Sequence, residues 1–362
     1  YLAEGLAEQI ATRLGGVARL TTISRTAVRR MHSPELLSVQ QLGRTLNAAY
    51  LVSGSIRAAG GRVRVNVEAL RASTGATVWS AAYDRAADEL IGLEEAIATE
   101  VAAGVAGRLS PEERRALQNR VTASSGAYEQ FLRGNVLLAQ RTGASMQAAV
   151  AAYHAATAAD SGFADAYARL SYAYSLIVNW IPVSRSEVDS LLGLSRQAAA
   201  RALRLNPRSS DAWMGRAYLL AMWSSVAAAG GDDTLLTSLA AFRRAVALNP
   251  RNDEAWHQYG STLRYVSDSA SLDAMRHALA LDPVRAVTYL DIAWTYYFMA
   301  RLDRALGAID TAVALDPGAP FRTLRVLLRL AAGDTAGAVA DARLMPEMRS
   351  NPAVLAVFAH DS

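Results

Sequence analysis

The chain has 362 residues, 52% of them hydrophobic, and a formal net charge of +4, which is typical of a folded protein with more than one core. It contains no cysteine, which excludes disulfides, thiolate metal sites and cysteine nucleophiles. All its basic residues other than histidine are arginine, so neither a P-loop lysine nor a kinase lysine is available. No apolar run reaches the roughly 18 residues of a membrane-spanning helix.

Two helices with a short strand between them are expected first. Leucine and isoleucine recur four residues apart in 2–14, which predicts an amphipathic helix closed by a Gly-Gly pair. The short apolar run 18–24 is a strand candidate. The stretch "SPELLSVQQLGRTLN" then predicts a second helix, with Ser33 as N-cap and Pro34 at the first helical position.

Three strands and a long helix are expected next. The segments 48–58, 62–70 and 76–85 are separated by short turns that contain glycine. In the middle segment valine alternates with polar residues, which predicts a sheet with one buried and one solvated face. A helix over 89–109 is expected to cover this sheet, and a linker follows near 121–126.

The order and spacing of these segments resemble a known family. "YLAEGLAEQI", then "LGRTLNAAYLVSGSIRAAGGRVRVNVEAL", then "STGATVWSAAYDR" is similar to the TolB-like amino-terminal domain of bacterial signalling proteins, over roughly the first 110 residues. That domain commonly precedes tetratricopeptide repeats and is attached to Ser/Thr kinase, adenylate cyclase or winged-helix modules. The strand that usually opens the family's domain is missing here, so we expect a truncated domain, with room for a membrane anchor upstream of residue 1.

From residue 126 onward the pattern is wholly helical and repeats itself. Proline recurs with gaps of 43, 33 and 34 residues, alanine lies five residues before each proline, and Trp or Tyr lies six residues after the first three. These positions are Pro207, Pro250, Pro283 and Pro317, with Ala202, Ala245, Ala278 and Ala312, and Trp213, Trp256 and Tyr289. A period of about 34 residues with this arrangement is typical of tetratricopeptide repeats, in which antiparallel helix pairs stack on one another.

Each part of the repeated phrase has a structural role. Alanine allows two helices to approach closely, and Asn-Pro or Asp-Pro ends the second helix of a pair. The aromatic residue is expected to fill the space between repeats. We therefore predict an α+β chain: a small α/β domain over 1–120, followed by an all-α superhelix of about six tetratricopeptide-like helix pairs over 126–362.

No catalytic constellation is found in the sequence. The five histidines occur without an HExxH motif or a pair at helical spacing, and the paired carboxylates lie on helix faces that we expect to be solvated. Glycine-rich phosphate loops and a GxSxG elbow are absent. We therefore expect no enzyme activity, metal or cofactor. An arginine-rich band over 25–64 lacks the aromatics or recognition helix of a nucleic-acid site, so nucleic acid is not an expected partner.

The tetratricopeptide pattern implies a concave groove lined by the first helix of each pair. In such families the second, fifth, ninth, twelfth and thirteenth positions of the repeat point into the groove. Carried onto this sequence, these positions are Tyr172, Met214, Tyr218, His257, Arg264, Tyr265, Trp294, Tyr297 and Phe298, with Asp165, Asp211 and Glu254 near the edge. An aromatic lining with few charges suits a peptide with apolar or aromatic side chains better than a terminal carboxylate. In the alternative interpretation, "WTYYF" belongs to the core between repeats.

The expected function is a non-catalytic interaction and sensory scaffold within a larger bacterial signalling protein, which binds a protein or peptide in this groove. Two alternatives stay open: a small-molecule receptor, and a regulatory region of an attached kinase or cyclase. The resemblance favours the extracytoplasmic (periplasmic) side of a membrane-anchored protein, while the residues themselves are also compatible with the cytoplasm. The oligomeric state is not indicated by the sequence.

Overall fold

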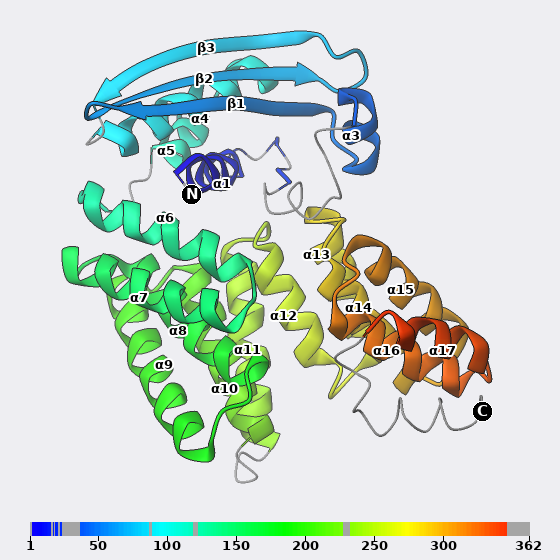
Figure 1. Cartoon of the computed structure of the whole chain (residues 1–362). Coiled ribbons are helices and arrows are strands. Elements are labelled where there is room, and N and C mark those ends of the chain that lie inside the picture. Colours follow the sequence, from blue (N-terminus) through cyan, green and yellow to red (C-terminus); the bar gives the residue numbers. More distant parts are fainter. Residues whose placement is uncertain are drawn as a thin grey trace. The chain divides into compact units, whose positions relative to one another are not determined.

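The computed structural model describes residues 2–15, 17, 19–20, 22–23, 37–86, 89–118, 122–226 and 232–345. Its amino-terminal part is layered, with a three-stranded antiparallel sheet of order β1-β2-β3 packed on helix α4, which in turn packs on α1 (Figure 1). The strands are β1 Tyr50–Ala59, β2 Arg62–Arg71 and β3 Thr77–Ala86. The helices of this part are α1 Leu2–Leu14, α3 Val39–Thr45, α4 Leu90–Ala106 and α5 Pro111–Leu117.

The sheet has the two unlike faces that its sequence predicts. Val63 and Val65 of β2 are buried, because alternate residues of a strand point to the same face. On the opposite face Arg62 and Arg64 both bind the carboxylate of Asp84 on β3, each at 2.8 Å. The long helix α4 packs on β2 and β3, as expected for the helix that covers the sheet.

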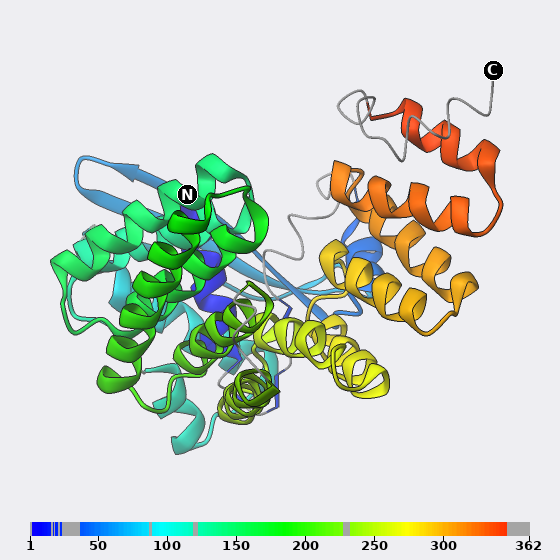
Figure 2. The same cartoon turned by 90° about the horizontal axis from the view of Figure 1, so that it is seen from below.

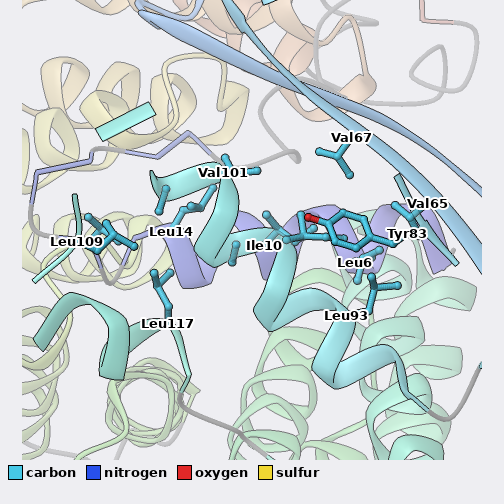
Figure 3. Close-up of a cluster of buried hydrophobic side chains, with 14 of the residues drawn as sticks. Leu6, Ile10, Leu14, Val65, Val67, Tyr83, Leu93, Val101, Leu109 and Leu117 are labelled. Atoms are coloured by element: carbon cyan, nitrogen blue, oxygen red, sulfur yellow. The ribbon is translucent and has the colours of Figure 1, made fainter. Parts of the chain in front are cut away.

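The core of this part lies between the sheet and α1 (Figure 3). The apolar stripe of α1 predicted by its four-residue spacing is buried, through Leu6, Ile10 and Leu14. It meets Leu93 and Val101 of α4, which belong to the same cluster. One continuous apolar core therefore joins α1, α4 and the sheet.

Two local predictions differ from the structure or lie outside it. The expected N-cap Ser33 lies outside the described residues, and the described helix α3 is capped by Ser38, whose side chain accepts from the Gln41 amide. The described residues of the run 18–24 form no strand. The approach to the linker contains a further helix, α5, because Ser110 forms a capping box with Glu113.

A buried polar contact links α1 and α4 to the first helix of the repeat region. Arg13 and Tyr128 both donate to the carboxylate of Glu94, which is only 1% exposed, and Arg13 also donates to the Leu117 carbonyl at 2.7 Å. Burial raises the pKa of Glu94 to about 7, although the positive charge of Arg13 opposes the rise. The contact therefore places an ionisable group where three helices meet.

The rest of the described chain consists of helices that pair with their neighbours in sequence. The pairs are α6 Ser125–Ala139 with α7 Gly143–Ala159, α8 Ala164–Trp180 with α9 Arg185–Leu205, α10 Ser210–Val226 with α11 Asp232–Leu248, α12 Asp253–Leu263 with α13 Asp268–Leu281, α14 Ala286–Phe298 with α15 Leu302–Leu315, and α16 Ala319–Ala331 with α17 Thr335–Arg343. The fold class is therefore confirmed: a small α/β layer is followed by tetratricopeptide-like helix pairs. The predicted insertion in the second pair lengthens its helices, since α8 continues to Trp180 and α9 has 21 residues.

The repeated phrase forms the joints between pairs. The four alanines of the phrase are fully buried, and each accepts the last helical hydrogen bond from the Asn or Asp four residues later. The side chains of Asn206, Asn249 and Asp316 then each accept from the backbone amide two residues on, which forms an Asx turn. Trp213 and Tyr289 donate to the carbonyls of the prolines six residues before them.

The structure falls into two compact units, and the boundary lies inside α12, between Ala255 and Trp256. Unit 1 contains the sheet, the helices around it and the pairs α6 to α11. Unit 2 contains most of α12 and the helices from α13 to α17. Within each unit successive helices lie side by side (Figure 2).

Candidate functional site

The expected groove residues divide between the two units, and those in unit 1 are buried. Tyr172 of α8 is 1% exposed, and Met214 and Tyr218 of α10 are also buried. The rings of Tyr172 and Tyr218 lie 5.2 Å apart. Because all three side chains are buried, they do not form an open surface in this structure.

Tyr172 belongs to a polar cluster that joins three segments of unit 1. Its hydroxyl donates to Glu254 at 2.5 Å, and the guanidinium of Arg141 binds both carboxylate oxygens of Glu254 at 3.1 Å. Arg141 also lies over the rings of Tyr172 and Trp180, each at 5.9 Å. Burial raises the pKa of Tyr172 above its usual range. We call Arg141, Tyr172 and Glu254 the polar clamp.

The sequence did not point to Arg141. It lies in the turn between α6 and α7, 113 residues from Glu254, and no motif surrounds it. One structural signal is its backbone, which is left-handed with φ of 56°, a region that residues other than glycine rarely adopt.

The expected edge residues of unit 1 are also paired. Asp211 binds Arg169 at 3.4 Å and accepts a hydrogen bond from Asn252 at 2.8 Å. Burial raises the pKa of Asp165 to about 6, and the negative charge of Asp211 adds to the rise. At the positions where a binding partner was expected, the first helices of unit 1 thus carry ion pairs with residues of this chain.

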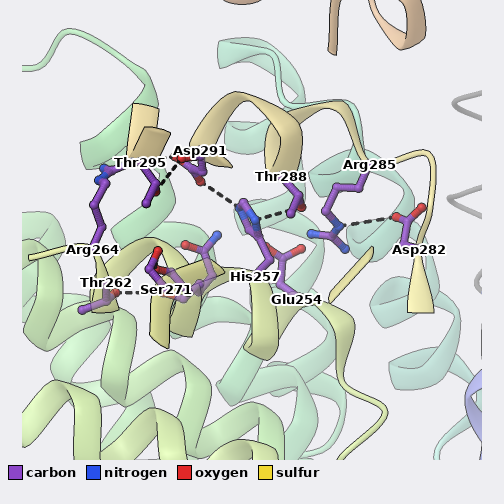
Figure 4. Close-up of polar contacts among 12 residues, drawn as sticks. Glu254, His257, Thr262, Arg264, Ser271, Asp282, Arg285, Thr288, Asp291 and Thr295 are labelled. Atoms are coloured by element: carbon purple, nitrogen blue, oxygen red, sulfur yellow. Dashed lines mark hydrogen bonds and ion pairs between the residues drawn. The ribbon is translucent and has the colours of Figure 1, made fainter. Parts of the chain in front are cut away.

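In unit 2, His257 does not face outward as expected. It is 3% exposed, its Nδ1 lies 3.0 Å from the Thr288 hydroxyl, and its Nε2 lies 3.7 Å from Asp291 (Figure 4). Asp291 also binds Arg264 at 3.2 Å. Burial raises the pKa of Asp291, while the charge of Arg264 opposes the rise. His257 is buried because its ring fills the space between α12 and α14.

The remaining predicted residues include three exposed aromatic side chains, two of which form a ring cluster with Trp294. Among the described aromatic side chains, the exposed ones are Tyr265 (66%), Tyr297 (42%) and Phe298 (63%). Trp294 is half-buried and stacks on Phe298 with centroids 5.8 Å apart, and its ring meets that of Tyr297 edge-on at 5.9 Å. Arg264 lies over the Tyr265 ring at 5.5 Å. We call Tyr265, Trp294, Tyr297 and Phe298 the aromatic surface.

Helix geometry explains how α14 presents this cluster. Asp291, Trp294 and Phe298 are spaced i, i+3 and i+7, so they share one face of the helix. Tyr296 and Trp294 both pack against the core of the α14 and α15 pair, whereas Tyr297 and Phe298 are exposed. The segment "WTYYF" therefore contributes side chains to both the core and the surface.

The described histidines outside this region have packing or surface positions. His154 contacts the Tyr174 hydroxyl at 2.6 Å, and His277 stacks on Trp256 at 4.6 Å. Within the described ranges, no group of three or more His, Asp or Glu side chains is placed to hold a metal ion. In the same ranges, no helix is both long enough and apolar enough to cross a membrane.

Comparison with protein-family models finds no match. Among curated proteins the chain is similar to "Putative adenylate cyclase 3" of Rhizobium meliloti (strain 1021), with 26% identity over 200 residues. The similarity covers 55% of this chain and 34% of that protein, so the chain spans about a third of the length of this relative.

Solved structures, two of them of tetratricopeptide-repeat proteins, align with parts of the chain. One is a thermophilic protein of Thermus thermophilus, with 18% identity, coverage of 56% of this chain and 99% of that chain, and a TM-score of 0.47. Another is YrrB, described as having an unusual peptide-binding site, with 21% identity, coverage of 57% and 92%, and a TM-score of 0.33. The MamA protein aligns at 17% identity over 53% and 92%, with a TM-score of 0.33. The fold assignment rests on the helix pairs and joints of this chain itself.

Proposed function

We propose that the chain is a non-catalytic protein-interaction module, and that unit 2 binds a peptide segment through the aromatic surface. The observation that carries the proposal is the position of the exposed aromatic side chains after two successive first helices. Tyr297 and Phe298 end α14, and Tyr265 lies in the turn that follows the end of α12 at Leu263. Elsewhere in the described chain, aromatic side chains are buried or half-buried.

The chemistry of the aromatic surface favours a partner with apolar or aromatic side chains. Exposed rings offer a large contact area at a low cost in conformational entropy, and they dominate the energetics of many interfaces. The nearby charges of Arg264 and Asp291 are already paired with each other. A peptide that presents a leucine, phenylalanine or tryptophan is therefore a better match than one recognised by its charge.

Peptide display against the purified chain tests this proposal. Peptides that bind the wild type should contain large apolar residues, and Tyr297→Ala with Phe298→Ala should weaken their binding by about tenfold or more, as for interface hot spots. Leu236→Ala is a matched control, because Leu236 is an exposed apolar residue of unit 1. Selected peptides that bind the double variant as tightly as the wild type would refute the assignment.

We also propose that the module belongs to a larger bacterial signalling protein. The similarity to a third of a putative adenylate cyclase supports this context, as does the resemblance of the first 110 residues or so to the TolB-like domain. In this proposal the domains span 1–120 and 126–362, the protein is membrane-anchored, and this part lies on the periplasmic side. Cell fractionation of the whole protein tests the location, and recovery in the cytoplasmic fraction alone would contradict it.

Regulation of an attached cyclase is the second candidate function, and the similarity to the Rhizobium protein is the observation that favours it. The test is cyclic AMP formation by the full-length protein, with and without a peptide selected on the aromatic surface. A change in rate that is lost in the Phe298→Ala variant would support regulation through this surface. No cyclic AMP formation, or a rate that does not respond to the peptide, would exclude this candidate.

A further inference from the structure

Tyr172 and its neighbour Tyr218 lie at positions of unit 1 that the repeat pattern predicts to face a binding partner. Such positions should be accessible, yet both side chains are buried. Glu254 at the start of α12 covers the hydroxyl of Tyr172, and Arg141 reaches the same carboxylate from the turn after α6. The clamp thus joins the first and fourth helix pairs of the repeat region, across the first-helix surface formed by α8 and α10. Contacts between such distant segments are not required by the stacking of neighbouring pairs.

The partial exposure of the ion pair indicates that the clamp does more than fill space. The side chains of Arg141 and Glu254 are 20% and 14% exposed, so water reaches the edge of the ion pair. A partly buried ion pair adds little net stability compared with apolar packing, because the loss of hydration offsets the attraction. The left-handed backbone of Arg141 follows the C-cap of α6, as that of Ala300 follows the C-cap of α14, so it belongs to the turn within a pair and is not evidence for the clamp.

We infer that the polar clamp is an autoinhibitory contact: the structure shows a closed state of the first-helix surface of unit 1, and release of Glu254 uncovers Tyr172 and Tyr218. In the closed state the carboxylate of Glu254 occupies the hydrogen-bonding groups of Arg141 and Tyr172. In the released state Arg141 becomes solvated and the two neighbouring tyrosine rings become accessible. This inference concerns unit 1 and does not depend on the binding proposed for the aromatic surface of unit 2.

Tyrosine nitration read out by mass spectrometry tests the inference on the whole chain. In the wild type, Tyr172 should react slowly, as Tyr153 does, since both are buried, whereas the exposed Tyr265 should react quickly. In Glu254→Ala, nitration of Tyr172 should become about tenfold faster, because the opening of this surface becomes easier. Tyr153 should stay protected, because its hydroxyl bonds to Asn135 outside the clamp.

A second variant and a control separate release of the clamp from loss of the fold. Glu254→Gln keeps the shape of the side chain but removes its charge, so the rate at Tyr172 should rise by less than in the alanine variant. Asp189→Ala removes a carboxylate that is 65% exposed, and it should leave all rates unchanged. Continued protection of Tyr172 in a folded Glu254→Ala variant would overturn the inference. So would equal deprotection of Tyr172 and Tyr153, since the clamp would then be part of the core.

Discussion

The buried carboxylate of Glu94 gives a prediction about the dependence of stability on pH. Its pKa is raised from 4.5 to about 7 by burial between α1, α4 and α6. The folded chain therefore keeps a proton on Glu94 between these two values, where the unfolded chain has lost it. The unfolding free energy should fall as the pH rises from about 4.5 to about 7, and the shift of about 2.5 pKa units corresponds to about 3 kcal/mol.

The Glu94→Gln variant isolates this contribution. Glutamine retains the size of the side chain and does not ionise, and its single carbonyl oxygen can take the place of one of the two acceptor oxygens of Glu94. Other groups with a raised pKa, such as Asp165, titrate in both proteins, so their contributions to the pH dependence cancel in the comparison. Wild type should therefore lose about 3 kcal/mol more stability than the variant between pH 4.5 and pH 8.

Urea unfolding of both proteins over this pH range, at constant ionic strength, measures the difference. Hydrogen exchange of peptides from α4 would assign the difference in stability to the region around Glu94. If the two unfolding free energies run parallel from pH 4.5 to pH 8, Glu94 titrates at its ordinary pKa and the reasoning from burial is wrong. A constant offset between them would report only the general cost of the substitution.

Three further predictions concern packing and ion pairs. Gly134→Ala should cost about 1–3 kcal/mol, because the new Cβ would lie 2.5 Å from the Tyr153 ring, whereas Gly126→Ala in the same helix meets nothing and should be neutral or stabilising in thermal unfolding. Asp341→Asn should cost about 3 kcal/mol in urea unfolding, because Asp341 is buried and pairs with Arg325 and Arg329. Asp310→Asn, which changes an exposed partner of the same Arg325, should cost less than about 1 kcal/mol, and equal losses would refute this distinction. Phe298→Ala should change stability by no more than about 0.5 kcal/mol, so a large drop in its melting temperature would show that Phe298 belongs to the core.

Much of the fold follows from local patterns in the sequence. The structure has the strand, the helix and the helix ends that three sequence patterns predict. These patterns are the valine alternation of β2, the leucine spacing of α1 and the recurrence of alanine and proline. Each pattern acts on the structure of nearby residues. The helix α5 begins at a capping box of Ser110 and Glu113, which is also a local pattern. The joints show why the phrase recurs: each ends a helix and starts an Asx turn.

The candidate site could be predicted only in part. The repeat positions predicted which residues lie on the first helices, and in unit 2 these positions include the exposed Tyr265, Tyr297 and Phe298. The same positions gave Tyr172 and His257, which are buried, because burial depends on partners far away in sequence or on the next pair. Arg141 meets Glu254 across 113 residues, and no periodicity encodes that contact.

The position of the boundary inside α12 has a practical consequence for dividing this protein into fragments. A fragment that ended at Ala255 would retain only the first turn of a helix, which is too short to be stable by itself. The Asx turn at Asn249 is the better place to end a fragment, because the helix α11 is already complete there. Such a fragment would lack Glu254 while keeping Arg141 and Tyr172, so the truncation would also remove the carboxylate of the clamp.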